Sequence, residues 1–181
     1  MTRPKGMTGT MFDALIRGFY YAGINPQTTS EGTKRIVQTM GTSVSASAGT
    51  HAKQGEITDS SGKKIEYSAC VDISVRGLTK PQIKKLLLQL AIQGYAGWYR
   101  YQGTFAGANR HIHLVWCGHY IKDEIVRRQA IDYLQNRTGL VGHSLEQFFT
   151  APENVDKPLA QMLARSNPQL KKRIPAHLLE I

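Results

Sequence analysis

The first part of the chain pairs a helical pattern with a long polar stretch. Over residues 11–24 the large apolar side chains recur at helical spacing, which predicts a helix with one face packed on a core. These side chains are Phe12, Leu15, Ile16, Phe19 and Tyr20. Gly23 and Pro26 are expected to end the helix. Residues 28–47 are rich in Ser, Thr and Gly and predict a loop or a weak strand.

From residue 51 to residue 75 the apolar pattern takes a period of two. Two strand-like runs flank the turn signal Asp59-Ser60-Ser61-Gly62, which predicts a β-hairpin. In the second part of this region, residues 70–75 alternate as a strand does. One face of that strand would carry Cys70, Asp72 and Ser74 and the other Val71, Ile73 and Val75.

Residues 79–94 carry the clearest helical pattern in the chain. Thr79 and Gln82 stand at capping-box spacing, and Pro81 suits the first turn. The apolar stripe consists of Ile83, Leu86, Leu87 and Leu90. Gly94 is expected to close the helix.

The next segment predicts two strands and a further helix. Residues 95–103 and 110–118 read as strands with a turn at 105–109 between them, and residues 123–135 read as a helix. In the second strand, alternation places His111 and His113 on one face and Ile112, Leu114 and Trp116 on the other. Two imidazoles on one face can bind a metal or move a proton. The same pair is also compatible with the solvent face of an amphipathic strand.

Taken together, these patterns predict an α+β fold with a small antiparallel sheet flanked by helices. At 181 residues, with 41% hydrophobic and 20% charged residues, the chain suits one globular domain. We assign residues 1–150 to that domain. Residues 151–181 contain four prolines and the cluster Lys171-Lys172-Arg173, and they predict a basic, peripheral helical tail.

The charge balance narrows the class of partner. Lys and Arg number 23 against 13 Asp and Glu, a net charge of +10. Such an excess favours an anionic partner: a cell-wall peptide or polymer, nucleic acid or a membrane surface. The chain shows no apolar run of the about 20 residues that span a bilayer and no signal peptide. It is therefore expected in the cytoplasm, or outside it by another route of release, and its oligomeric state stays open.

Several residues suit a metal site. Catalytic zinc takes three protein ligands from His, Asp, Glu or Cys and leaves a fourth position for water, which it activates. The candidates are His51 in a glycine-flanked stretch, Asp72 on its strand, and the pair His111 and His113. Cys70 and Cys117 lie in apolar runs and are expected to be buried free thiols.

The order of these motifs resembles a known family. GTHA, then SACVDISV, then a helix and HIH is similar to the zinc peptidase superfamily of D-alanyl-D-alanine carboxypeptidases and dipeptidases, murein endopeptidases and hedgehog domains. The resemblance spans residues 51–118. It implies a hedgehog-like α+β fold, a zinc cofactor and a cell-wall peptide as substrate.

Carried over by position, the resemblance implies His51, Asp72 and His113 as zinc ligands and His111 beside the activated water. Two features depart from the family: the predicted hairpin separates the first two ligands, and no Glu precedes the last one. Either His111 or Glu66 would then serve as the general base. Arg100 is a candidate for binding a substrate carboxylate.

Two other functions fit parts of the same pattern. Paired histidines on a strand are also typical of nucleases that nick single-stranded DNA, in which both bind a metal and a tyrosine attacks the phosphate. Tyr133, with arginines around it, would be that tyrosine, although its position on a helical stripe also suits the core. The third possibility is a non-catalytic, zinc-stabilised binding domain, with residues 98–101 as an aromatic contact surface.

Overall fold

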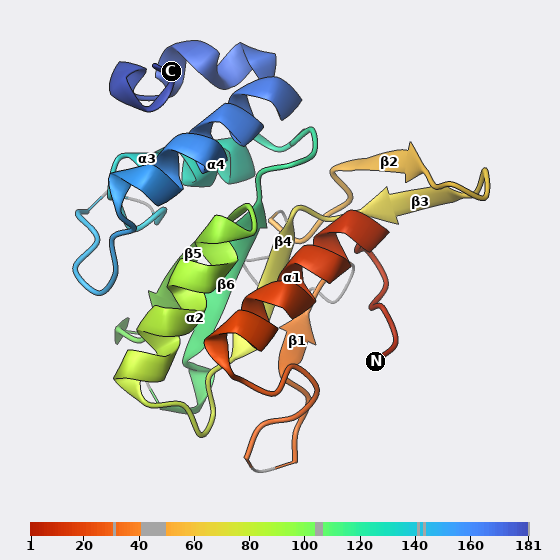
Figure 1. Ribbon diagram of the computed structural model, residues 1–181, viewed down its shortest axis with the longest axis vertical. Helices are drawn as coiled ribbons and strands as arrows, with labels where there is room; N and C mark the ends of the chain where they lie inside the picture. Colours follow the sequence, from red (N-terminus) through yellow and green to blue (C-terminus); the bar gives the residue numbers. More distant parts are fainter. Residues whose placement is uncertain (31, 41–49, 104–106, 141, 143, 181) are drawn as a thin grey trace.

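The computed structural model describes residues 1–30, 32–40, 50–103, 107–140, 142 and 144–180. Its centre is a four-stranded antiparallel sheet with the order β1-β4-β6-β5 (Figure 1). The strands are β1 (Ile36–Gln38), β4 (Cys70–Ser74), β5 (Tyr95–Arg100) and β6 (His111–Trp116). The predicted α+β class, with a small antiparallel sheet and flanking helices, is confirmed.

The register of the sheet brings the polar positions of three strands together. Asp72 on β4 lies opposite His113 on β6, and Trp98 on β5 lies opposite the same histidine. Ser74 and Arg100 flank His111 in the same way. Since side chains alternate along each strand, all of these point to one face of the sheet.

Two helices cover the other, apolar face. They are α1 (Gly9–Ala22) and α2 (Lys80–Ile92), which lie side by side in front of the sheet in Figure 1. Gly18 permits the close contact, because a Cβ there would lie 2.5 Å from Leu90 Cδ2. The predicted end of α1 at Gly23 and the capping box of Thr79 and Gln82 are both confirmed.

The polar face is partly covered by the second pair of helices, α3 (Glu124–Leu134) and α4 (Glu153–Ser166). Their apolar side chains share one cluster with Trp98 and Val115 of the sheet. The C-terminal segment continues as η3 (Pro168–Arg173) and η4 (Ala176–Leu178). It is helical but not peripheral, because Leu159, Leu163 and Leu170 are buried in that cluster. Lys171, Lys172 and Arg173 remain exposed.

The predicted hairpin forms outside the main sheet. Strands β2 (Gly55–Thr58) and β3 (Lys64–Tyr67) pair antiparallel and extend beyond the helices (Figure 1). Asp59 Oδ1 accepts hydrogen bonds from the backbone N–H groups of Ser61 and Lys63, which fixes the turn. The predicted turn at 105–109 is described only as η2 (Gly107–Asn109). None of the described helices is long and apolar enough to cross a bilayer.

Candidate metal centre

The three ligands implied by the resemblance lie together in the fold. His51, Asp72 and His113 are buried, and one donor atom from each lies within 4.8 Å of the other two. His51 comes from the segment before β2, Asp72 from β4 and His113 from β6. Gly49, the first residue of the matching Gly-x-His motif, lies outside the described residues. The hairpin therefore separates His51 from Asp72 along the chain without separating them in space.

The spacing of the donor atoms suits a small metal ion. His51 Nε2 lies 3.3 Å from Asp72 Oδ2, and His113 Nδ1–H donates a hydrogen bond to Asp72 Oδ1 at 2.8 Å. The first of these distances is the separation of two ligands on a tetrahedral zinc with bonds of about 2.0–2.1 Å. Neither ring nitrogen of His51 makes a well-directed hydrogen bond to a described residue, although both are buried. A cation among these three side chains would satisfy His51, so the donor set fits a metal.

The charge states of the group also suit a metal. Burial acts to raise the pKa of Asp72, but the hydrogen bond from His113 and the electrostatic attraction of the His113 and His51 rings outweigh it and hold that pKa well below its usual range. Burial lowers the pKa of His113, which outweighs the opposing influence of Asp72. An ionised carboxylate and a neutral imidazole are the forms that bind metal ions.

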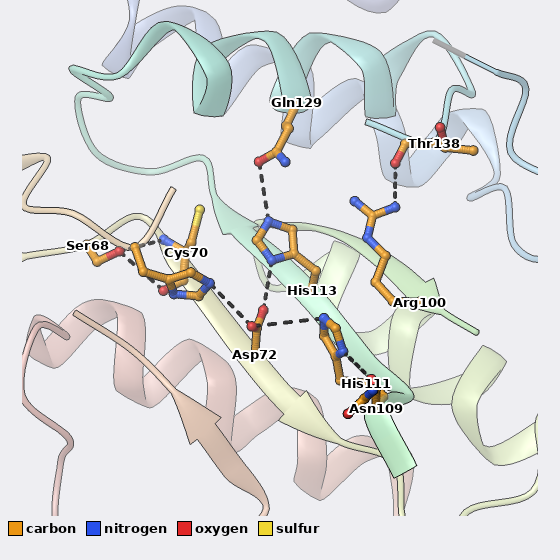
Figure 2. Close-up of polar contacts among 10 residues, drawn as sticks. Ser68, Cys70, Asp72, Arg100, Asn109, His111, His113, Gln129 and Thr138 are labelled. Atoms are coloured by element: carbon orange, nitrogen blue, oxygen red, sulfur yellow. Dashed lines mark hydrogen bonds and ion pairs between the residues drawn. The ribbon is translucent and has the colours of Figure 1, made fainter. Parts of the chain in front are cut away.

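His113 is held on several sides. Its ring stacks on Trp98 with centroids 6.1 Å apart and meets the His51 ring edge-on at 5.7 Å. Figure 2 shows Asp72 on one side of the imidazole and Gln129 of α3 on the other, where Gln129 Oε1 lies 3.3 Å from Nε2. Sequence reasoning did not assign Gln129 to the site. Its signal was a polar side chain on the apolar stripe of a predicted helix.

His111 lies beside the group on the same strand. Its Nδ1 is 2.7 Å from the carbonyl oxygen of Asn109, and its Nε2 is 3.9 Å from Asp72 Oδ2 (Figure 2). A carbonyl oxygen only accepts hydrogen bonds, so Nδ1 carries the proton. In neutral His111 the lone pair is then on Nε2, on the side of Asp72. This tautomer allows His111 to accept a proton at the site.

Arg100 is a buried cation near the metal ligands. Its Nη1 donates to the carbonyl oxygen of Thr138 at 2.6 Å (Figure 2). Its guanidinium lies 5.2 Å from the centroid of the Trp98 ring. Its Nη2 is buried with no hydrogen-bond partner in the part of the chain that the structure describes. Burial lowers the pKa of Arg100 to about 10, so the side chain stays charged at neutral pH. Arg100 also lines a cavity of about 250 Å³ with Tyr99, Tyr101 and Glu146.

Tyr133, the nucleophile of the nuclease alternative, and Glu66, the alternative general base, lie outside the group of His51, Asp72 and His113. Tyr133 is buried against Trp98 with ring centroids 5.6 Å apart, and its hydroxyl has no hydrogen-bond partner among the described residues. Burial raises the pKa of that hydroxyl well above its usual value. Glu66 on β3 is bound by Lys53, with Nζ and Oε1 2.6 Å apart. The contacts of Glu66 are therefore on the hairpin, and those of Tyr133 are in the core.

The chain was also compared with known proteins. It matches no family, no curated protein and no solved structure.

Proposed function

We propose that this protein is a zinc-dependent peptidase that cleaves a cell-wall peptide. The observation that carries the proposal is the group of His51, Asp72 and His113, buried together with their donor atoms facing one another. In the described residues this group contains His113 and not His111, as the peptidase motif order implies. A nuclease of the nicking type would use both histidines as ligands.

Each side chain has a distinct task in this proposal. His51, Asp72 and His113 hold the zinc, which when bound makes a water molecule acidic and polarises a carbonyl group. His111 accepts the proton at Nε2, because its Nδ1–H is engaged with Asn109. A positioned general base of this kind contributes about 10²- to 10⁴-fold to the rate. In this proposal His111 takes the place of the family glutamate that the sequence lacks.

The substrate class rests on charge and on Arg100. The net charge of +10 favours an acidic polymer such as the bacterial cell wall, whose peptides carry carboxylates. Arg100 offers Nη2, which has no partner among the described residues, to a substrate carboxylate, while the carbonyl oxygen of Thr138 accepts from Nη1. Replacing Arg100 with Gln is therefore expected to raise KM for a carboxylate-ended peptide more than it lowers kcat.

The test is zinc analysis combined with hydrolysis of synthetic cell-wall stem peptides, followed by mass spectrometry. The wild type is expected to bind one zinc and release a peptide product. His113→Ala should lose both zinc binding and peptide hydrolysis. His111→Ala should keep the zinc and lose most of the hydrolysis. Retention of zinc by both His51→Ala and Asp72→Ala would overturn the proposed site.

A non-catalytic zinc-stabilised domain is the second candidate. It is favoured by the pairing of Glu66 with Lys53, which leaves the carboxylate proposed as an alternative base on the hairpin. In that case the wild type binds zinc and cleaves no stem peptide, and His111→Ala changes neither property. Nicking of single-stranded DNA that Tyr133→Phe abolishes would establish the nuclease instead.

A further inference from the structure

The polar face of the sheet is covered by α3 and the residues that follow it. Three polar side chains of the sheet each hydrogen-bond to this segment. His113 contacts Gln129, Trp98 Nε1 donates to the carbonyl oxygen of Arg137 at 2.8 Å, and Arg100 donates to that of Thr138. Of these three contacts, the one with Gln129 is the only one that uses a side chain of α3 (Figure 2).

Gln129 occupies a position that an apolar residue would fill without cost. Its neighbours on the inner face of α3, Val126, Ala130 and Tyr133, belong to the core cluster, and Gln129 is itself only 6% exposed. Burying an amide is unfavourable unless it is hydrogen-bonded. Its contact with His113 therefore offsets the cost of placing a polar group there.

The contact also favours one nitrogen of His113 as the ligand of a metal. Without a metal, Nδ1–H of His113 donates to the ionised carboxylate of Asp72 at 2.8 Å. A metal bound at Nδ1 would displace that proton, and the neutral ring would then carry its proton on Nε2, where Gln129 Oε1 lies 3.3 Å away as an acceptor. In that tautomer the lone pair lies on Nδ1, the nitrogen that faces Asp72. The opposite tautomer would direct a proton into the group.

We infer that Gln129 is a positioning residue of the metal centre: it accepts a hydrogen bond from Nε2–H of His113 when Nδ1 is the ligand atom, and so stabilises the tautomer that binds the metal. The inference rests on the proposed zinc site but not on peptide hydrolysis. Groups that fix a ligating histidine in this way typically change metal affinity by about 10- to 100-fold. Trp98, stacked on the ring, limits its tilt but cannot select the tautomer.

Zinc affinity, measured by competition with a chromophoric chelator, tests the inference. Gln129→Met keeps the length of the side chain and removes the acceptor, so a loss of about 10- to 100-fold in affinity is expected. Gln129→Glu restores an acceptor and should bind zinc within a few-fold of the wild type. The matched control is Gln135→Met at the end of α3, whose side chain contacts the carbonyl oxygen of Arg173 and no metal ligand; it should bind as the wild type does.

A second readout separates positioning from general damage to the fold. Nitrogen-15 NMR of the zinc-bound protein should show His113 protonated at Nε2 in the wild type and in Gln129→Glu, and that proton should exchange faster in Gln129→Met. Equal affinity in Gln129→Met and the wild type, or an equal loss in Gln135→Met, would overturn the role of Gln129. A wild type that binds no zinc would instead overturn the metal site itself.

Discussion

The two faces of the central sheet are built from the same strands but from opposite alternations of residues. On one face Ile73, Ile112 and Leu114 pack under α1 and α2 in a continuous apolar cluster. On the other, Asp72, His111, His113 and Arg100 gather beneath α3. Three of these four polar side chains are buried, each at a cost that only hydrogen bonds or a bound ion can offset.

Within the six residues of β6, alternate side chains therefore serve different purposes: one set stabilises the fold and the other forms the candidate site. Leu114 removes apolar surface from water, which stabilises the fold whatever the pH or the metal content. His113, its neighbour in the chain, is stabilised by its contacts with Asp72 and Gln129 and, in the proposed metal site, by the bound ion. The apolar face should therefore respond to changes in volume, and the polar face to metal ions and protons.

The largest expected effect is on the apolar face. Leu114→Ala removes a fully buried side chain that packs over Gly97 and is expected to lower the free energy of unfolding by about 2–5 kcal/mol. Urea denaturation measures the loss. The zinc affinity of the folded protein should stay within a few-fold of the wild type, and a large loss of affinity would show that the two faces are not independent.

The next effect concerns the metal. At a free zinc concentration 100 times the Kd, the wild type is expected to gain about 2.7 kcal/mol of stability. Asp72→Asn keeps the shape of the side chain but removes the charge between the two histidines, so zinc should no longer shift its melting temperature. Thermal denaturation with and without zinc measures both. An unchanged shift in Asp72→Asn would contradict the ligand assignment.

The two buried carboxyl groups Asp72 and Asp156 have pKa values shifted in opposite directions. Asp72 has a lowered pKa, whereas burial raises the pKa of Asp156 on α4 to about 7. The folded state thus holds a proton on Asp156 that the unfolded chain loses near its ordinary value of 3.8. Asp156 therefore does not destabilise the folded state below pH 3.8, and the free energy of unfolding falls as the pH rises from that value to about 7.

Asp156→Asn removes this penalty. With allowance for partial screening by solvent, the gain at pH 8 is expected to be about 1–2 kcal/mol, and it should shrink as the pH falls toward 4. Urea denaturation at pH 8, 6 and 4 measures it. A gain that does not vary with pH would exclude ionisation of Asp156 as its cause.

The smallest effect is expected at Tyr133. Because its buried hydroxyl has no hydrogen-bond partner in the described residues, Tyr133→Phe removes an unsatisfied polar group and should raise the free energy of unfolding by about 0.5–1 kcal/mol. Zinc binding and any peptide hydrolysis should be unaffected. A strong effect of this variant on a nucleic-acid reaction would place the chemistry on α3 and not on the histidine group.

The sequence by itself determined the local elements and the faces of the strands. Alternation placed Asp72 with Cys70 and Ser74, and His113 with His111, because the side-chain period of a strand is fixed by its backbone. The capping box at Thr79 and the turn at Asp59 were also readable, since each is completed within four residues.

Only the tertiary structure decided which faces meet. The pairing of β4 with β6 sets Asp72 opposite His113, 41 residues away, and the docking of α3 sets Gln129 against the same ring. The burial of Leu159 and Leu163 in the expected peripheral tail has the same origin. Local periodicity specifies which residues share a face, but the contact between two faces depends on strand order and helix docking, which distant parts of the chain determine together.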